Sequence, residues 1–247
     1  NAGGGESQPL RVTASSSNTG LIPNPTVTYT TANATGSIAF TPVTDQSGTA
    51  TITVTVEDGG LDGNLDTAGD NATFSRTFDV TVNAGNDAPT LNSLSNESIS
   101  EDASEQTRNL AGITAGGGEF QPLRVTSTSS STGLIPNPTV TYTTANAAGS
   151  IAFTPVTDQS GTATITVTVE DGGLDGNLST AGDNATFNRA FDVTVNAVND
   201  APTLNALSNV SIDEDASEQT VNLAGITAGG SESQPLRVTA TRSSTGL

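Results

Sequence analysis

The chain repeats itself at a fixed distance of 113 residues. The phrase "QPLRVT" begins at Gln8, Gln121 and Gln234, and "NDAPTL" begins at Asn86 and Asn199. Because no insertion or deletion separates the copies, each copy is expected to fold in the same way. The repeat predicts three segments: residues 1–87 are the C-terminal part of one repeat, 88–200 a complete repeat, and 201–247 the N-terminal part of the next.

The two incomplete repeats have two interpretations. Either further repeats lie outside the given sequence, or the incomplete repeats complement one another between chains. We favour the first, and the second stays open as a hypothesis.

Short runs rich in Thr, Val, Ile and Phe fill the complete repeat, and clusters of Gly, Pro, Asn, Asp and Ser separate them. Alternating runs bounded by turn residues are typical of β-strands. The pattern predicts seven strands, at 97–100, 107–114, 123–129, 139–143, 150–154, 162–170 and 187–196. Seven strands in one repeat predict an all-β fold of tandem, seven-stranded Greek-key β-sandwiches.

The sixth of these strands, "TATITVTVED", has the clearest alternation. Ala163, Ile165, Val167 and Val169 are expected to face the core, while the Thr residues between them face water. A ladder of regularly spaced Thr is also the pattern of an ice-binding face. The simpler interpretation is that Thr favours strands on a solvated surface.

Composition removes most catalytic chemistry. The chain has 26 acidic and 7 basic residues, the basic ones all Arg, and it contains no Lys, His, Cys, Met or Trp. Without His, Cys and Lys only carboxylate chemistry remains, so we expect no enzyme. A net charge of −19 repels nucleic acid and attracts cations. No apolar run reaches the roughly 18 residues of a membrane span, so no membrane insertion is expected.

Acidic residues gather where the predicted strands end, which points to a metal ion. Like charges about 4 Å apart repel by roughly 1 kcal/mol in water and more in a lower dielectric, so converging carboxylates need a counter-ion. A set of Asp, Glu, Asn and backbone oxygens suits Ca²⁺. The acidic positions are Glu101, Asp102, Asp158, Glu170, Asp171 and Asp200, the last following Asn199.

Four phrases carry a resemblance: E-D-A (101–103), T-D-Q-S-G (157–161), V-T-V-E-D-G-G (167–173) and V-N-A-V-N-D-A-P (195–202). Their order resembles that of a cadherin repeat and of the bacterial cadherin-like and Ig-like tandem-repeat domains of large surface adhesins or fibrils. The resemblance implies repeats joined end to end, an extracellular location at the cell surface or after secretion, and calcium between successive repeats.

The resemblance also implies the ligands. The implied ligands are Glu101, Asp158, Asn199, Asp200 and Glu232 at the second junction, and Asp45, Asn86, Asp87, Glu119 and Asp171 at the first. Two departures from the family pattern suggest fewer or weaker ions. In this chain "AGGGE" replaces the pair of aspartates that the family usually has after the second strand. The linker of the family begins with Asp, and this chain has Asn83 or Asn196 at that position. The alternative is that these acids are solvated loop carboxylates without metal.

Two further features have weaker interpretations. In the loop 58–71, Asp62, Asn64 and Asp66 have the spacing of a calcium loop, but Thr67 replaces the expected Gly, so an acidic turn is an equal alternative. Six sequons are candidate attachment points for N-linked glycans, at Asn33, Asn71, Asn96, Asn177, Asn184 and Asn209.

Stiff linkers complete the functional expectation. Pro89 and Pro202 restrict the backbone of each linker, and a bridging ion would remove the remaining freedom. We therefore expect a calcium-stiffened structural extender of an extracellular adhesin or surface fibril. Its partners would be neighbouring repeats of the same chain and other copies in a fibril. Two alternatives remain: a carbohydrate-binding or homophilic adhesion module, and a filament subunit completed between chains.

Overall fold

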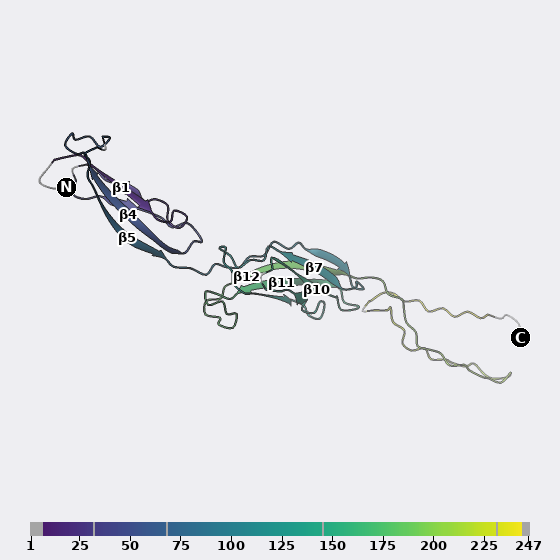
Figure 1. The fold of residues 1–247 in the computed structure, drawn as a ribbon. Coiled ribbons are helices and arrows are strands. Elements are labelled where there is room, and N and C mark those ends of the chain that lie inside the picture. The colour runs from purple at the N-terminus through teal and green to yellow at the C-terminus, as the bar shows by residue number, and fades with distance from the viewer. Residues whose placement is uncertain (1–6, 32, 68, 145, 231, 244–247) are drawn as a thin grey trace. The chain divides into compact units, whose positions relative to one another are not determined.

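The computed structural model describes residues 7–31, 33–67, 69–144, 146–230 and 232–243. Within these residues the chain is all-β, with strands and turns and no helix (Figure 1). It divides into two compact units, which are treated separately below. Unit 1 comprises Asn1–Asp87, Gly116–Glu119 and Gly173–Asn184, and unit 2 comprises Ala88–Ala115, Phe120–Gly172 and Ala185–Leu247.

Unit 2 contains a complete β-sandwich of seven strands. They are β6 (Glu97–Ser100), β7 (Gln106–Ala111), β8 (Leu123–Ser129), β9 (Thr139–Thr141), β10 (Ala148–Phe153), β11 (Gly161–Asp171) and β12 (Thr186–Asn196). One sheet has the order β6-β12-β11-β8 and the other β7-β10-β9. All neighbours are antiparallel except β6 and β12, which run parallel.

The alternation of β11 explains how the core is built. Ala163, Ile165, Val167 and Val169 are fully buried, and the intervening Thr residues are partly exposed, as expected. Phe191 of β12 packs against the same core, with its ring 6.5 Å from that of Phe153 in the other sheet. The core therefore lies between the two sheets, which is the predicted sandwich.

All seven strands predicted in the complete repeat are confirmed, and the strand ends differ by a few residues. The largest difference is in β7, which ends at Ala111 because Gly112 adopts a left-handed conformation with φ of 69°. A side chain at that position would collide with the side chain of Asn92. Thr114, predicted as part of the strand, instead forms an isolated bridge with Thr90.

Unit 1 contains five strands around a smaller core. They are β1 (Leu10–Ser16), β2 (Thr26–Thr28), β3 (Ser37–Ala39), β4 (Gly48–Asp58) and β5 (Thr73–Val82). The sheets have the orders β1-β4-β5 and β2-β3. The buried side chains that form this core cluster are Leu21, Ile22, Ala50 and Ile52.

Residues 201–230 and 232–243 form no strand, apart from a bridge between Thr203 and Thr227. Many apolar side chains of this segment are exposed to solvent, among them Leu204, Ile212 and Leu223. The division of the chain into repeats at 87/88 and 200/201 stays a prediction. Among the described residues, no helix is long and apolar enough to cross a membrane.

Candidate metal centre

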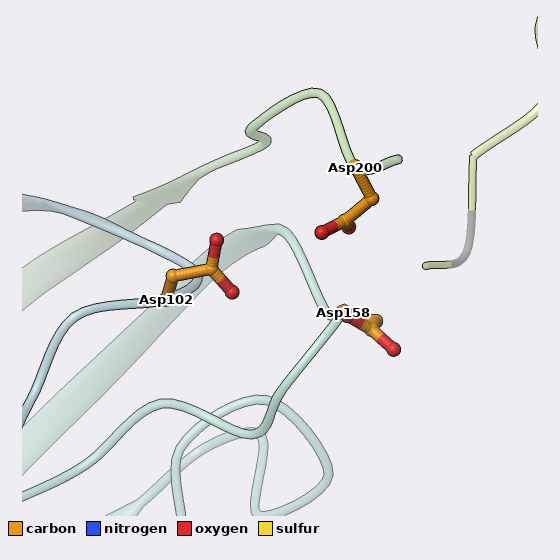
Figure 2. A group of neighbouring side chains, drawn as sticks. All are labelled: Asp102, Asp158 and Asp200. Atoms are coloured by element: carbon orange, nitrogen blue, oxygen red, sulfur yellow. The ribbon is translucent and has the colours of Figure 1, made fainter. Parts of the chain in front are cut away.

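Three aspartates from separate segments meet at one end of the unit 2 sandwich (Figure 2). Asp102 lies in the turn between β6 and β7, Asp158 in the turn between β10 and β11, and Asp200 follows β12. One carboxylate oxygen of each lies within 4.8 Å of such an oxygen in the other two. The sheet register explains the meeting, since β6 and β12 end together at the point where β11 begins.

Backbone conformation positions Asp158. Its φ is 59°, in the left-handed region that non-glycine residues rarely adopt and that Asp tolerates better than most. Asp45, the residue 113 positions earlier, has the same φ of 59°. In both copies an aspartate at this turn therefore adopts a strained backbone conformation. Such strained residues are typical of functional positions.

Further acidic and amide groups surround Asp200. The backbone N–H of Asp200 donates to Glu232 Oε2 at 3.2 Å, and that of Val198 donates to Glu101 Oε1 at 2.8 Å. Asn199 Oδ1 accepts a hydrogen bond from Gln234 Nε2 at 2.8 Å. Glu101 is buried, so a second carboxylate is held next to the linker backbone.

Gly230 lets the following segment approach the carboxylates closely. Its φ is 44°, and a methyl group there would collide with Asp200 Oδ2 and lie 3.4 Å from Asp158 Oδ1. A left-handed glycine therefore brings backbone against two members of the cluster without filling the space between them.

The cluster lacks a protein counter-charge. Among the described residues, ion pairs join Arg11 to Glu57 and Asp66, Arg108 to Glu97, and Arg124 to Glu170, and none reaches the three aspartates. Asp200 Oδ2 is buried and accepts no hydrogen bond from any residue that the structure describes. A buried carboxylate oxygen beside two other carboxylates is costly unless a cation is present.

Burial raises the pKa of Asp200 above its ordinary value, and the charges of Asp102, Asp158, Glu232 and Glu101 raise it further. The folded state therefore holds this proton more tightly than the unfolded state does. Binding of this proton stabilises the folded state. The stabilisation is complete below the ordinary pKa of an aspartate and is lost as the pH rises through the raised pKa of Asp200.

This shift gives a pH prediction. In chelator, lowering the pH from neutral towards the ordinary pKa of an aspartate should raise the melting temperature of the wild-type chain relative to that of Asp200→Asn, which has no proton to gain. Differential scanning calorimetry of both chains over this pH range measures the difference. Identical pH profiles would show that Asp200 is not held against neighbouring charge.

Unit 1 has a related but less complete arrangement. A pocket of about 450 Å³ is lined in part by Asp45, Asp87 and Glu119. The backbone N–H of Asp87 donates to Glu119 Oε2 at 3.3 Å, as that of Asp200 does to Glu232. No described residue of unit 1 corresponds to Asp102.

Asp171 closes the loop that follows β11. It is fully buried at the end of β11, where its Oδ1 accepts a hydrogen bond from the backbone N–H of Ala185 at 2.9 Å. Asp58, its counterpart, accepts from the backbone N–H groups of Gly60 at 3.1 Å and Ala72 at 2.9 Å. These bonds fix the base of the loop after each long strand, a role that the sequence did not reveal.

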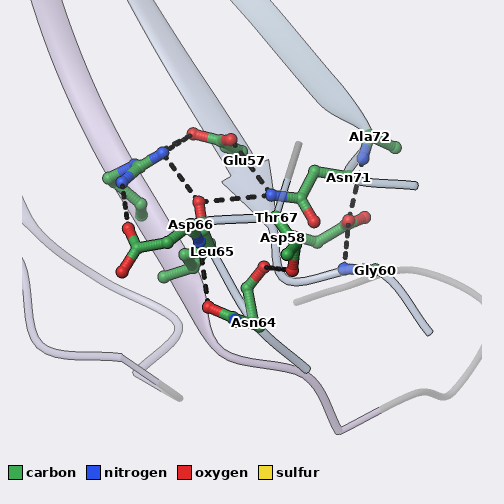
Figure 3. Close-up of polar contacts among 10 residues, drawn as sticks. Glu57, Asp58, Gly60, Asn64, Leu65, Asp66, Thr67, Asn71 and Ala72 are labelled. Carbon is green, nitrogen blue, oxygen red and sulfur yellow. Dashed lines mark hydrogen bonds and ion pairs between the residues drawn. The ribbon is translucent and has the colours of Figure 1, made fainter. Parts of the chain in front are cut away.

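The loop 58–71 uses its own polar atoms to form turns (Figure 3). Asp62 Oδ1 accepts from the N–H of Asn64 at 2.8 Å, Asn64 Oδ1 accepts from that of Asp66 at 3.0 Å, and Thr67 Oγ1 donates to Asp62 Oδ2 at 2.6 Å. The same bonds recur at Asp175, Asn177, Ser179 and Thr180. Because Ser179 replaces Asp66 without changing the turn, the spacing of oxygens here serves local structure.

An ion pair anchors this loop to the sheet (Figure 3). Arg11 Nη2 donates to Glu57 Oε2 at 2.7 Å and to the carbonyl of Leu65 at 3.1 Å. The hydrogen bond from Arg11, followed by one from Asn71, lowers the pKa of Glu57. Arg124 and Glu170 repeat the pair in unit 2. The ion pairs of Arg11 and Arg124 with these strand carboxylates therefore do not reach the aspartate cluster.

The structure brings together part of the predicted ligand set. Asp158 and Asp200 meet, with Glu101, Asn199 and Glu232 beside them. Asp102 was not in the predicted ligand set, although it stands next to Glu101 in the same acidic phrase. In unit 1, Asp45, Asp87 and Glu119 line one pocket. Asn86 donates through Nδ2 to the carbonyl of Asp183 at 3.0 Å. A shared ion that includes Asp171 stays a prediction.

Comparison with known proteins shows no matching family model and no matching curated protein. Among solved structures, the chain is similar to domains 4 and 5 of the S-layer protein SbsC, with 17% identity, a TM-score of 0.31, and coverage of 74% of this chain and 70% of that one. It is also similar to extracellular cadherin domains 3–6 of protocadherin gamma B2, with 13% identity, a TM-score of 0.35, and coverage of 81% and 45%. A third is zebrafish RET cadherin-like domains 1 to 4, with 10% identity, a TM-score of 0.28, and coverage of 77% and 42%. Similarity at this level does not assign a function to this chain, so its function is inferred from its own residues.

Proposed function

We propose that this chain is a structural, non-enzymatic repeat segment of an extracellular adhesin or surface fibril, and that calcium stiffens it at the aspartate cluster. The observation that carries the proposal is the meeting of Asp102, Asp158 and Asp200 around a buried, unpartnered carboxylate oxygen. Hard oxygen ligands of this kind suit Ca²⁺, which accepts six to eight of them in flexible geometry.

The residues around the cluster complete a ligand set for calcium. Asp102, Asp158 and Asp200 would hold the ion, and the carboxylates of Glu101 and Glu232 are close enough to raise the pKa of Asp200 by their charge. Bound calcium would supply the positive charge that five neighbouring carboxylates require.

The position of the cluster explains why an ion would stiffen the chain. Asp200 belongs to the linker, whereas Asp102 and Asp158 belong to turns of the preceding sandwich. Glu232 belongs to the segment that follows the linker and bonds to the backbone of Asp200. An ion held here would tie the linker to both sides, beside the restriction already imposed by Pro202. Extracellular calcium sites bind at about 10⁻⁴–10⁻³ M, so the linker would be loose inside a cell and rigid outside it.

Amide hydrogen exchange tests this function directly. In calcium, the linker amides at 197–203 should exchange more than about tenfold more slowly than in chelator, while those of β11 should not change. Asp200→Asn should remove the difference. Glu105→Gln, at an exposed acid in the same turn as Asp102, is the matched control and should keep it. Equal exchange with and without calcium in the wild-type chain would contradict the proposal.

A further inference from the structure

The loop that follows β11 differs from its earlier copy by a single residue. Residues 173–184 match residues 60–71 at every position except Ser179, where the earlier copy has Asp66. The change completes an N-x-S sequon at Asn177, whereas Asn64, the counterpart of Asn177, has no hydroxyl two residues later. One loop therefore has an attachment sequence for an N-linked sugar that its otherwise identical copy lacks.

A turn already joins the two ends of this sequon. Asn177 Oδ1 accepts a hydrogen bond from the backbone N–H of Ser179 at 3.0 Å. Asp175 fixes the turn, because its Oδ1 accepts from the N–H of Asn177 at 2.8 Å and its Oδ2 accepts from Thr180 Oγ1 at 2.7 Å. The side-chain amide and the residue that carries the hydroxyl are thus held together in the folded chain.

The earlier copy shows that the turn does not depend on the hydroxyl. Asn64 Oδ1 accepts from the N–H of Asp66 at 3.0 Å, and Thr67 Oγ1 donates to Asp62 Oδ2 at 2.6 Å (Figure 3). The chain therefore contains the same turn twice, once with the hydroxyl of a sequon and once without it.

The amide nitrogen of Asn177 is accessible. Asn177 and Ser179 are both exposed. Among the residues that the structure describes, none accepts a hydrogen bond from Asn177 Nδ2, and the only bond of the side chain is the one from Ser179 to its oxygen. A transferase could therefore reach both the nitrogen and the hydroxyl without opening the fold.

Asn71 and Asn184, which follow the two loops, lack this accessibility. Asn71 is half-buried, and its Nδ2 donates to Glu57 Oε1 and to the carbonyl of Leu65, both at 3.3 Å (Figure 3). Its counterpart Asn184 is half-buried as well. A sugar on the nitrogen of Asn71 would displace the bonds that connect this residue to the sheet and the loop.

The sequon at Asn96 is tied to a strand. Asn96 Oδ1 accepts from the backbone N–H of Asp192 at 2.9 Å, and Ser98 Oγ accepts from Asn196 Nδ2 at 2.8 Å. Its amide oxygen and its hydroxyl therefore bond to β12 and not to each other.

The last two sequons have no preformed turn. Asn33 and Asn209 are exposed, but among the described residues neither side-chain oxygen accepts a bond from the residue that carries the hydroxyl. Of the six sequons, the one at Asn177 combines an accessible nitrogen with a turn that is already formed.

The turn also favours the chemistry of attachment. An amide nitrogen is a weak nucleophile because its lone pair is delocalised into the carbonyl group. The bond from the N–H of Ser179 stabilises negative charge on Asn177 Oδ1, so the Nδ2 proton is easier to remove. The nitrogen then forms a bond to C1 of a glycosyl diphosphate, the C1–O bond breaks, the diphosphate leaves with the electron pair, and a base of the transferase takes the proton.

We propose that Asn177 is the acceptor of an N-linked sugar in the folded chain. An attached sugar is bulky and well solvated, and it would shield the exposed loop around it, including Leu174, which is 56% exposed. This inference goes beyond the calcium function, because the three clustered aspartates lie outside the loop.

Glycosylation of the purified, folded full chain tests the proposal. The chain is incubated with a soluble N-glycosyltransferase and UDP-glucose, and glycopeptide mass spectrometry measures the occupancy of each sequon. Occupancy at Asn177 should exceed that at Asn71 and Asn184 by about tenfold or more, because those two half-buried residues become accessible only when the structure opens locally. Proteolytic peptides that contain the same three sequons are the control, and they should be modified to similar extents.

Two matched variants exchange the single difference between the loops. Ser179→Asp should abolish modification of Asn177, and Asp66→Ser should create a second acceptor at Asn64 with similar occupancy. Both positions are exposed and the turn is the same in both copies, so neither change should disturb the fold. Asp66→Ser also removes an exposed contact with Arg11 of 3.7 Å, which should contribute little to stability.

Three results would overturn the proposal. Asn177 could stay unmodified in the folded chain while its peptide is modified. Asn71 and Asn184 could be modified in the folded chain as readily as Asn177, which would mean that the fold selects nothing. Asp66→Ser could leave Asn64 unmodified, which would mean that the turn does not determine the acceptor. None of these outcomes depends on calcium, so this proposal and the proposed function fail separately.

Discussion

Adding calcium should raise the melting temperature of the unit 2 sandwich by about 10 °C or more. A ligand present at 100 times its dissociation constant stabilises the folded state by about 2.7 kcal/mol, and for a domain of this size each kcal/mol corresponds to roughly 4–8 °C. Magnesium should have little effect, because it gives up its water ligands reluctantly. Calorimetry of the full chain in calcium, in magnesium and in chelator measures the three values.

Asp158→Asn is the sharpest variant for this experiment. Asn tolerates the left-handed conformation of residue 158, so the turn should survive while one carboxylate of the cluster is lost. The calcium-dependent rise should largely disappear, whereas Glu105→Gln should retain it. A rise of equal size in Asp158→Asn would show that calcium acts elsewhere on the chain.

Phe191→Ala should destabilise unit 2 by about 3–5 kcal/mol, the usual cost of removing a buried phenylalanine. Its ring is almost fully buried between the two sheets and packs against Phe153. Phe78→Ala should cost much less, because Phe78 is 41% exposed in unit 1. Urea unfolding, followed separately for the two units by hydrogen exchange, measures both costs. Equal costs for the two variants would contradict the difference in exposure between Phe78 and Phe191.

The strands of unit 2 were predictable because side-chain alternation reflects burial on one face only. Ile165, Val167 and Val169 alternate with Thr over the whole of β11, and no other regular structure buries every second residue. The strand ends were less predictable. Gly112 ends β7 through its left-handed backbone, and a glycine in sequence does not reveal its φ.

The location of the metal centre was more predictable than the identity of its ligand residues. Asp158 and Asp200 follow from acids at strand ends that the sheet brings together. The choice between Glu101 and Asp102 depends on the conformation of one turn, which buries Glu101 against the N–H of Val198 and directs Asp102 to the cluster. Asp171 has the acidic identity of a ligand, but its Oδ1 already serves the N–H of Ala185.

The left-handed conformation of Asp45 and Asp158 makes heat resistance and calcium binding conflicting aims in protein engineering. Gly would relieve the backbone strain at either position, so a library selected for heat resistance in a calcium-free buffer would be enriched in these replacements. The selected variants would resist heat better in that buffer, but they would lack one carboxylate ligand for calcium. Selection conditions for repeat segments of this kind should therefore include the ion, or the most thermostable clones will be the least able to respond to it.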